Sequence, residues 1–204
     1  TAGVCIATSG PGATNLVTGL ADAYLDSVPV VAITGQVATT LLGTDAFQEV
    51  DAFGITMPVV KHSFLADRAD ELDEQMWRAF RIATSGRNGP VHVDLPKDVQ
   101  QAEARQGRHE RLENREEEGN KFAIAEAARL LKESKRPLMY AGGGIHQAGA
   151  VGAFRRICEH LRVPTVCSLK GLGALPSGHP LLLGMMGMHG SGRANRALRD
   201  CDLL

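Results

Sequence analysis

The sequence has 204 residues, of which 44% are hydrophobic and 22% are charged, and its formal net charge is −1. This composition is typical of a globular chain that forms one large domain or parts of two. The apolar runs are shorter than the ~20 residues of a bilayer-spanning helix, and the chain has no run rich in Lys and Arg. We therefore expect no membrane and no nucleic acid as partners, and a small molecule instead.

The four cysteines and seven histidines are scattered along the chain. They form no C-x-x-C, H-E-x-x-H or H-x-H pattern, so the sequence predicts buried free thiols and no metal site. Free thiols are typical of a reducing cytoplasm.

The first hundred residues alternate strand and helix patterns. The apolar, β-branched run at 2–8 predicts a strand, and the turn Ser9–Gly12 follows it. Apolar residues recur at helical spacing between Ala13 and Leu25, which predicts a helix. Further strands are predicted at 28–33, 58–60 and 90–95, and a further helix at 72–83, closed by Gly86.

The character of the chain changes at residues 100–121, which are dense in charges of both signs. This stretch predicts a solvated linker between domains, with a surface helix as the alternative. The α/β pattern then restarts, with helices through Ile124–Leu131 and 151–161 and strands at 137–141 and 163–167. The fold class is therefore α/β, with two parallel-sheet units of three layers.

Ligands of parallel α/β sheets bind at the carboxyl ends of the strands. Four segments lie there: Ser9–Asn15, Gly35–Gln48, Pro96–Asp98 and Gly142–Gly144. Singly, each residue has an ordinary explanation: a tight turn at SGPGATN, a core aromatic at Phe47, a solvated charge at Lys97, a helix C-terminal cation at Arg87 and a loop histidine at His189. SGPGATN lacks the G-K-[ST] of a P-loop, and the triple glycine fails G-x-G-x-x-G at Gln147.

Together, the segments carry a resemblance. TSGPGATNLVTGLADAYLDSVPVVAITGQV, GTDAFQEVDAFGITMPVVKHSF, ATSGRNGPVHVDLPKDVQ, YAGGGI, SLKGLGALP and LGMMGMHG closely resemble the catalytic subunit of the acetohydroxyacid synthase (acetolactate synthase) family. The resemblance covers nearly the whole chain and is most specific in residues 1–100. It implies a thiamine diphosphate enzyme of branched-chain amino-acid biosynthesis, of which this chain is an internal fragment.

The resemblance also implies a domain organisation. Residues 1–99 would be the later part of the pyrimidine-binding domain, 100–121 the linker, and 122–204 the first part of a central FAD-binding domain. Pro11, Asn15, Ser27 and Gln48 would lie near the thiamine cofactor. FAD would be structural, and its contacts would be Arg87, Gly142, Gly143, Gly144, Ser168, Leu169, Met186, Gly187, Met188 and His189.

By the same resemblance, the reaction decarboxylates pyruvate and joins the remaining two-carbon unit to a second 2-keto acid, pyruvate or 2-ketobutyrate. Phe47 would exclude water from a carbanion-like intermediate, and Gln48 would offer an amide that does not protonate it. Lys97 would attract the anionic keto acid.

Parts of the family's machinery are expected outside this chain. The activating glutamate would precede Thr1, and the ligands of Mg²⁺ would follow Leu204, so the fragment alone should be inactive. The full protein would be a homodimer or homotetramer and could bind a regulatory small subunit. Ala38, Thr39 and Thr40 depart from the family's usual Pro-Arg-Arg at a herbicide-contacting loop, which predicts weak sulfonylurea inhibition.

Three alternatives stay open at this stage. A glyoxylate carboligase shares the SGP and SGR-x-GP segments, and a pyruvate oxidase-like enzyme would use the same cofactor. A non-catalytic cofactor-binding α/β module is the third.

Overall fold

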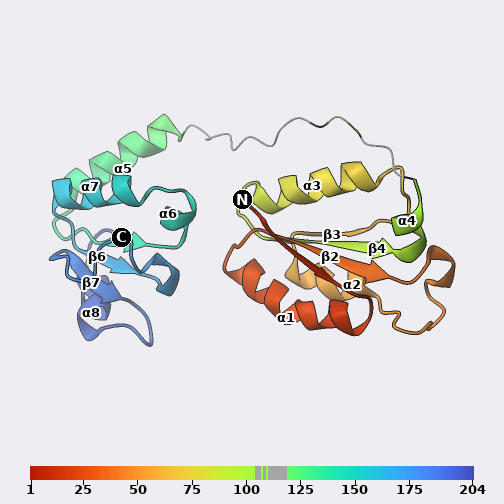
Figure 1. Cartoon of the computed structure of the whole chain (residues 1–204). Helices are drawn as coiled ribbons and strands as arrows, with labels where there is room; N and C mark the ends of the chain where they lie inside the picture. The colour runs from red at the N-terminus through yellow and green to blue at the C-terminus, as the bar shows by residue number, and fades with distance from the viewer. Residues whose placement is uncertain (104–106, 108, 110–118) are drawn as a thin grey trace. The chain divides into compact units, whose positions relative to one another are not determined.

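The computed structural model describes residues 1–103, 107, 109 and 119–204. The chain divides into two compact units, Thr1–Asn114 and Arg115–Leu204 (Figure 1). Most of the predicted linker, 100–121, lies outside the described residues, so that interpretation and the exact domain limits stay predictions. In the part of the chain that is described, no helix is long and apolar enough to cross a membrane.

The first unit contains a parallel sheet with the strand order β1-β2-β4-β3. Its strands are β1 (Gly3–Ala7), β2 (Val30–Gln36), β3 (His62–Leu65) and β4 (Pro90–Pro96). The central strand β4 pairs with both β2 and β3. Six of its seven residues are buried, and the buried set includes the polar residues His92 and Asp94.

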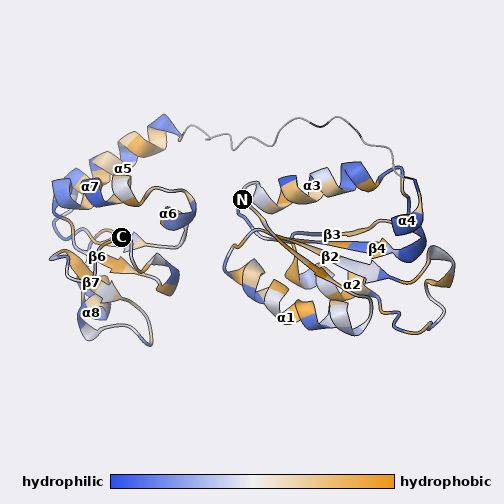
Figure 2. Ribbon diagram, in the orientation of Figure 1, coloured by the Kyte–Doolittle hydropathy of each residue, from blue (hydrophilic) through white to orange (hydrophobic). Residues whose placement is uncertain are grey.

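Helices cover both faces of this sheet, which gives the three predicted layers (Figure 1). They are α1 (Pro11–Leu25), α2 (Ala52–Thr56), α3 (Leu72–Thr84) and α4 (Lys97–Gln101), with 3₁₀ turns η1 (Thr39–Leu41) and η2 (Met57–Val59). Ala79 and Ala83 of α3 pack on Val91 and Val93, while Leu20 of α1 packs on the other face. In Figure 2 the apolar residues accordingly concentrate in the sheet and on the helix faces beside it.

The strand predicted at 58–60 is wrong. Met57–Val59 form a 3₁₀ turn, and the strand begins at His62. Pro58 has no N–H to donate to a sheet, so it favours the turn. The polar residues His62 and Ser63 hid the true strand from a reading of apolar patterns.

The second unit is also a parallel sheet between helices, with the order β5-β6-β7. Its elements are α5 (Lys121–Glu133), β5 (Met139–Ala141), α6 (Gly144–Gln147), α7 (Val151–Leu161), β6 (Thr165–Cys167), η3 (Leu169–Gly171), β7 (Leu182–Met185) and α8 (Gly192–Asp200). Phe154 of α7 packs in one apolar cluster and Ala194 of α8 in another. The fold class is therefore confirmed for both units.

Strand β7 and helix α8 were not predicted from the sequence. Four residues of the run at 182–187 are Leu or Met, and two are glycines, which weaken a strand pattern. Helix α8 carries three arginines and buries only Ala194 completely, so its apolar stripe is narrow.

Candidate functional site

The carboxyl ends of β1, β2 and β4 meet at one edge of the first sheet, because the three strands are parallel neighbours. The loop after β1 contains Gly10, the loop after β2 runs to Glu49, and Lys97 begins α4 directly after β4. The loop after β1 packs closely on the end of β2: a methyl group on Gly35 would lie 3.4 Å from the amide nitrogen of Ser9. Three of the predicted segments therefore lie at the same edge of the sheet.

Gly10 is where the first two loops touch. Its backbone has φ 60° and ψ −115°, a conformation that is costly for any other residue. A methyl group on Gly10 would lie 2.8 Å from the carbonyl oxygen of Gln48 and 3.0 Å from its Cα. Gln48 therefore lies directly against the start of α1, where Pro11 is the first residue and Asn15 follows one turn later on the same side. The structure brings these three predicted residues together.

The loop that carries Phe47 and Gln48 is organised around the carboxylate of Glu49. This carboxylate accepts hydrogen bonds from the main-chain N–H groups of Gly43, Thr44 and Ala46, the last two at 3.1 Å. The same bonds, that from Gly43 first, hold the pKa of Glu49 below its usual value.

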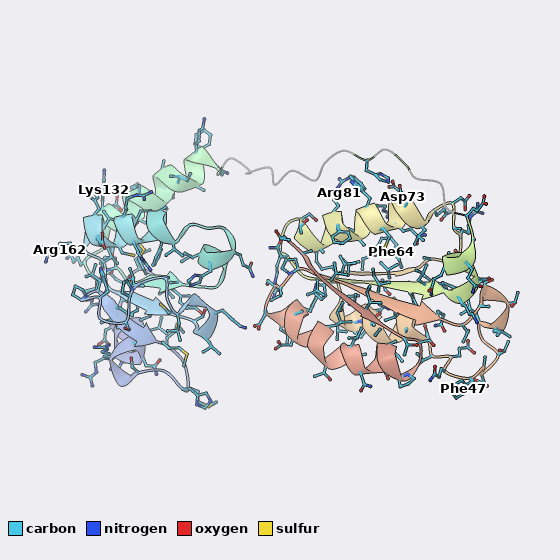
Figure 3. All side chains as sticks on the ribbon, viewed as in Figure 1. Phe47, Phe64, Asp73, Arg81, Lys132 and Arg162 are labelled. Carbon is cyan, nitrogen blue, oxygen red and sulfur yellow. The ribbon has the colours of Figure 1, made fainter. Side chains whose placement is uncertain are left out.

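Phe47 lies on the outside of this loop, and its side chain is 89% exposed (Figure 3). The first unit by itself therefore leaves the ring in water, although large aromatic side chains are usually buried. The roles of Phe47, Gln48 and Lys97 stay predictions.

A buried polar network supports the edge from below. The Gln36 side-chain amide donates to the carbonyl oxygen of Val50 at 2.8 Å and to the carboxylate of Asp94 at 2.9 Å. Thr34 donates to the other oxygen of Asp94 at 2.6 Å. Burial raises the pKa of Asp94. Through this network, hydrogen bonds connect Val50, near the end of the loop, to strands β2 and β4.

His92 extends the same network. Its Nε2 lies 2.7 Å from the hydroxyl of Thr34, and its Nδ1 lies 2.8 Å from Ser63 and 3.0 Å from Thr56. When Asp94 is ionised, Thr34 donates to it and can accept only from an N–H at Nε2. Burial lowers the pKa of His92 to about 4. The imidazole is therefore neutral and structural, since it is fully enclosed.

Asp98 ties the loop after β2 to the start of α4. It accepts from the main-chain N–H of Thr39 at 3.0 Å and from its hydroxyl at 2.5 Å. The Thr39 hydroxyl is the first cause of a lowered pKa at Asp98. Lys97, the preceding residue, is exposed at this edge. Thr39 thus has a defined structural partner at the position where the sequence departs from the family pattern.

Ser27 and Arg87 lie at the opposite, amino end of the first sheet. Ser27 precedes β2, and a seven-residue strand separates the two ends by roughly 20 Å. The Arg87 guanidinium donates to the hydroxyl of Ser27 at 2.6 Å and to the carbonyl oxygen of Leu25 at 2.9 Å. Arg87 is thus a cation at the C-terminus of α1, and the structure does not bring Ser27 together with Pro11 and Gln48.

The predicted FAD segments of the second unit gather at one edge of its sheet. The glycines 142–144 follow β5, Ser168 and Leu169 follow β6, and residues 186–189 follow β7. A methyl group on Gly171 would lie 1.9 Å from the carbonyl oxygen of Ala141, so the first two loops are in contact. Ser168 accepts from the N–H of Gly171 at 3.1 Å and fixes its loop.

Part of this edge is main chain without side chains. Methyl groups on Gly142, Gly144 and Gly187 would meet no atom within 4 Å. A ligand can therefore approach the backbone closely here, which is the use of glycine in cofactor loops. Met188 is 90% exposed beside it.

Asn195 of α8 holds the loop after β7. Its side-chain oxygen accepts from the N–H of Gly187 at 2.8 Å, and its nitrogen donates to the carbonyl oxygen of the same residue at 2.9 Å. Sequence reasoning missed Asn195, Gly10 and Glu49. Only Gly10, inside the SGPG turn, carries a sequence signal.

Over residues 1–103, 107, 109 and 119–204, no three His, Cys, Asp or Glu side chains form a group that could hold a metal ion.

Comparisons with known proteins connect these two edges to a family. The model for the N-terminal TPP binding domain of thiamine pyrophosphate enzymes matches residues 1–55, and the model for their central domain matches residues 124–204.

Curated relatives share about half of the residues. The chain is 52% identical over 99% of its length to acetolactate synthase isozyme 2 large subunit of Escherichia coli, and it covers 37% of that protein. It is 50% identical over its full length to the probable acetolactate synthase large subunit of Methanocaldococcus jannaschii, and covers 36% of it. The acetolactate synthase of Arthrospira platensis is also 50% identical. The chain thus spans little more than a third of the length of these relatives.

Proposed function

Since this chain belongs to the thiamine pyrophosphate enzyme family, we propose that it is part of an acetolactate synthase large subunit. In the reaction, two pyruvate anions and a proton give 2-acetolactate and carbon dioxide. With 2-ketobutyrate as the second acid, the product is its longer homologue, and both products feed branched-chain amino-acid biosynthesis. The packing of Gly10 against Gln48 is the observation that carries the proposal, because it brings the residue Gln48 to the N-terminus of α1.

The first edge fits thiamine diphosphate on the chemistry of its residues. Gln48 and Asn15 offer neutral amides beside Pro11, and no ionised side chain is among these three. The cofactor, when bound, supplies an electron sink for the carbon that loses carbon dioxide. Gln48 would orient the reacting groups without giving them a proton, and Phe47 would keep water away. Ligands of Mg²⁺ would come from outside this chain.

Lys97 would act through its charge. Its ammonium group is exposed at the same edge and would attract the carboxylate of a 2-keto acid. Asp98 would keep that segment in place through Thr39.

The second edge fits FAD, because its glycines leave main chain open at Gly142, Gly144 and Gly187. Ser168, Leu169, Met186 and His189 belong to the loops at the same edge. We assign this flavin a structural role. Arg87 as a flavin contact and Ser27 as a thiamine contact stay predictions of the resemblance, and within the first unit the two side chains bond to each other at the amino end of its sheet.

The full-length protein would be a cytoplasmic homodimer or homotetramer. In an oligomer, a second subunit would cover the ring of Phe47, which the first unit leaves exposed. Two of the relatives are named large subunits, which supports a small regulatory subunit as a further partner.

Product analysis of the full-length enzyme tests the proposal. Purified enzyme with thiamine diphosphate, Mg²⁺ and FAD should convert pyruvate to acetolactate, and should give the mixed product when 2-ketobutyrate is added. Acetate, or a product from glyoxylate alone, would instead favour a pyruvate oxidase or a glyoxylate carboligase. No turnover with any of these acids would favour a binding module.

A matched pair of variants connects the activity to the site. Gln48→Asn keeps a side-chain amide, and Asn tolerates the left-handed backbone at this position. Its side chain is shorter by one methylene group, so the variant should form acetolactate at least about tenfold more slowly. Gln101→Asn makes the same change on the exposed end of α4 and should leave the rate unchanged.

A further inference from the structure

Glu49 occupies an unusual position in the loop that carries Phe47 and Gln48. Its carboxylate points back into its own loop, where it accepts from the N–H groups of Gly43, Thr44 and Ala46. Hydrogen bonds to an ionised acceptor are roughly twice as strong as those between neutral groups. A single anion therefore collects most of the main-chain donors of a short segment.

The loop needs such an anchor because its backbone is strained. Asp45 and Gln48 have φ values of 58° and 62°, and Gly43 has φ 76°. The left-handed region is unfavourable for residues with a Cβ and persists only where surrounding contacts determine it. Bonds to Glu49 from Thr44 and Ala46 flank Asp45 directly.

Gly10 limits Gln48 from the other side. The contact with the Gly10 backbone prevents Gln48 from moving towards α1, and the Glu49 bonds prevent the loop from opening away from it. Asp51, the next acidic residue in the sequence, has a different role: its carboxylate accepts a hydrogen bond from the N–H of Gly54 and caps the N-terminus of α2.

We infer that Glu49 is a positioning residue, whose carboxylate holds the Gln48 amide and the Phe47 ring in their places at the site. The inference rests on the proposed function, because it assumes that Gln48 and Phe47 face the reacting carbons. A misplaced pair would admit water, and pyruvate and a proton would then give acetaldehyde and carbon dioxide instead of acetolactate.

The test compares Glu49→Gln, Glu49→Asp and Glu71→Gln in the full-length enzyme. Glu49→Gln replaces one acceptor oxygen by a donor that faces main-chain N–H groups, so it should raise the ratio of acetaldehyde to acetolactate about tenfold. Glu49→Asp keeps the charge and should recover part of the wild-type ratio. Glu71→Gln removes a charge at the exposed start of α3 and should change nothing.

Hydrogen exchange supplies a readout of the loop itself. In Glu49→Gln the amides of Gly43, Thr44 and Ala46 should exchange at least about tenfold faster, because a neutral amide offers them one oxygen in place of the two of an ionised carboxylate. The melting temperature and the affinity for thiamine diphosphate should stay at their wild-type values.

Faster exchange with a shifted product ratio would support the inference. A wild-type ratio in Glu49→Gln, or a ratio that changes only together with the melting temperature, would overturn it and leave the proposed function intact. Wild-type enzyme that forms no acetolactate would overturn the proposed function, and the inference with it.

Discussion

The loops at the two sheet edges are held by different chemistry. In the first unit the acceptors are carboxylates: Glu49 accepts main-chain N–H groups of its own loop, and Asp98 accepts the N–H of Thr39. In the second unit, the neutral side chains of Ser168 and Asn195 accept from Gly171 and Gly187. The loops of the first edge are therefore held by charged acceptors and those of the second by neutral ones, a difference that fits the reacting site and the static binding site proposed above.

The largest effect should come from Gly10→Ala. The new methyl group would meet Gln48 at 2.8 Å and the backbone would keep a conformation that costs about 1–3 kcal/mol. We expect acetolactate formation by the full-length enzyme to fall at least about 100-fold.

Gly19→Ala is the matched control, because a methyl group there meets nothing within 4 Å on the same helix. It should stabilise the protein by about 0.5–1 kcal/mol and leave the rate unchanged. Equal, small effects of the two variants would show that the contact between Gly10 and Gln48 has no role in positioning the loop.

Acid should affect the first unit before the second. The pKa of His92 is about 4 in the folded protein against 6.5 when unfolded, so only the unfolded chain gains this proton between these values. Its contribution to stability is complete above pH 6.5 and falls by about 3 kcal/mol as the pH approaches 4. The raised pKa of Asp94 acts in the opposite direction, because protonation favours the folded state there.

The second unit should keep its folded structure to a lower pH than the first. Asp202, which accepts from Ser134 and from the N–H of Lys135, has a pKa lowered to about 2, so its contribution is lost only between pH 3.8 and 2. Hydrogen exchange, corrected for the intrinsic rate, should show β2 and β4 losing protection at a higher pH than β5 and β6. His92→Gln should remove this difference, and simultaneous loss in both units of wild type would contradict the assignment.

Removal of the Asn195 side chain should loosen the open edge. Asn195→Ala leaves the N–H and the carbonyl of Gly187 without this partner, and FAD affinity measured by fluorescence titration should weaken about tenfold. Arg196→Ala changes an exposed neighbour on α8 and should have no effect. An unchanged FAD affinity in Asn195→Ala would show that the loop after β7 does not take part in flavin binding.

The smallest effect concerns Arg87, for which two roles compete. The bonds to Ser27 and Leu25 predict a loss of about 1–2 kcal/mol in the free energy of unfolding for Arg87→Ala, with FAD affinity unchanged. Arg87→Lys keeps the charge and should recover part of the stability. A tenfold weaker FAD affinity at unchanged stability would restore the flavin role that the resemblance implies.

The extent of prediction differs between elements for physical reasons. The helices α1, α3, α5 and α7 and the strands β1, β2, β4, β5 and β6 were predicted, because their apolar patterns are local. Strand β3 was misplaced because its polar Ser63 is satisfied by His92, which lies 29 residues away in the sequence. Helix α8 was missed because its narrow stripe is covered by strands that the local sequence does not reveal.

The candidate site shows the same division. The loops after β1, β2 and β4 were nominated from sequence, since parallel strands share a carboxyl edge. The partners within that edge were not, because Gly10 and Gln48 meet only through tertiary packing. Ser27 was grouped with Pro11 by resemblance, although the topology places it at the other end of β2.

By itself, the sequence determined the two α/β units, the chemistry of the loop residues and the resemblance to acetolactate synthases, because periodicity and motif spacing are local properties. Only the tertiary structure decided which loops are in contact. It also decided that Glu49 accepts hydrogen bonds from its own loop and that Arg87 donates to the last carbonyl group of α1. Such contacts depend on strand order, and strand order depends on packing between residues that are distant in the chain.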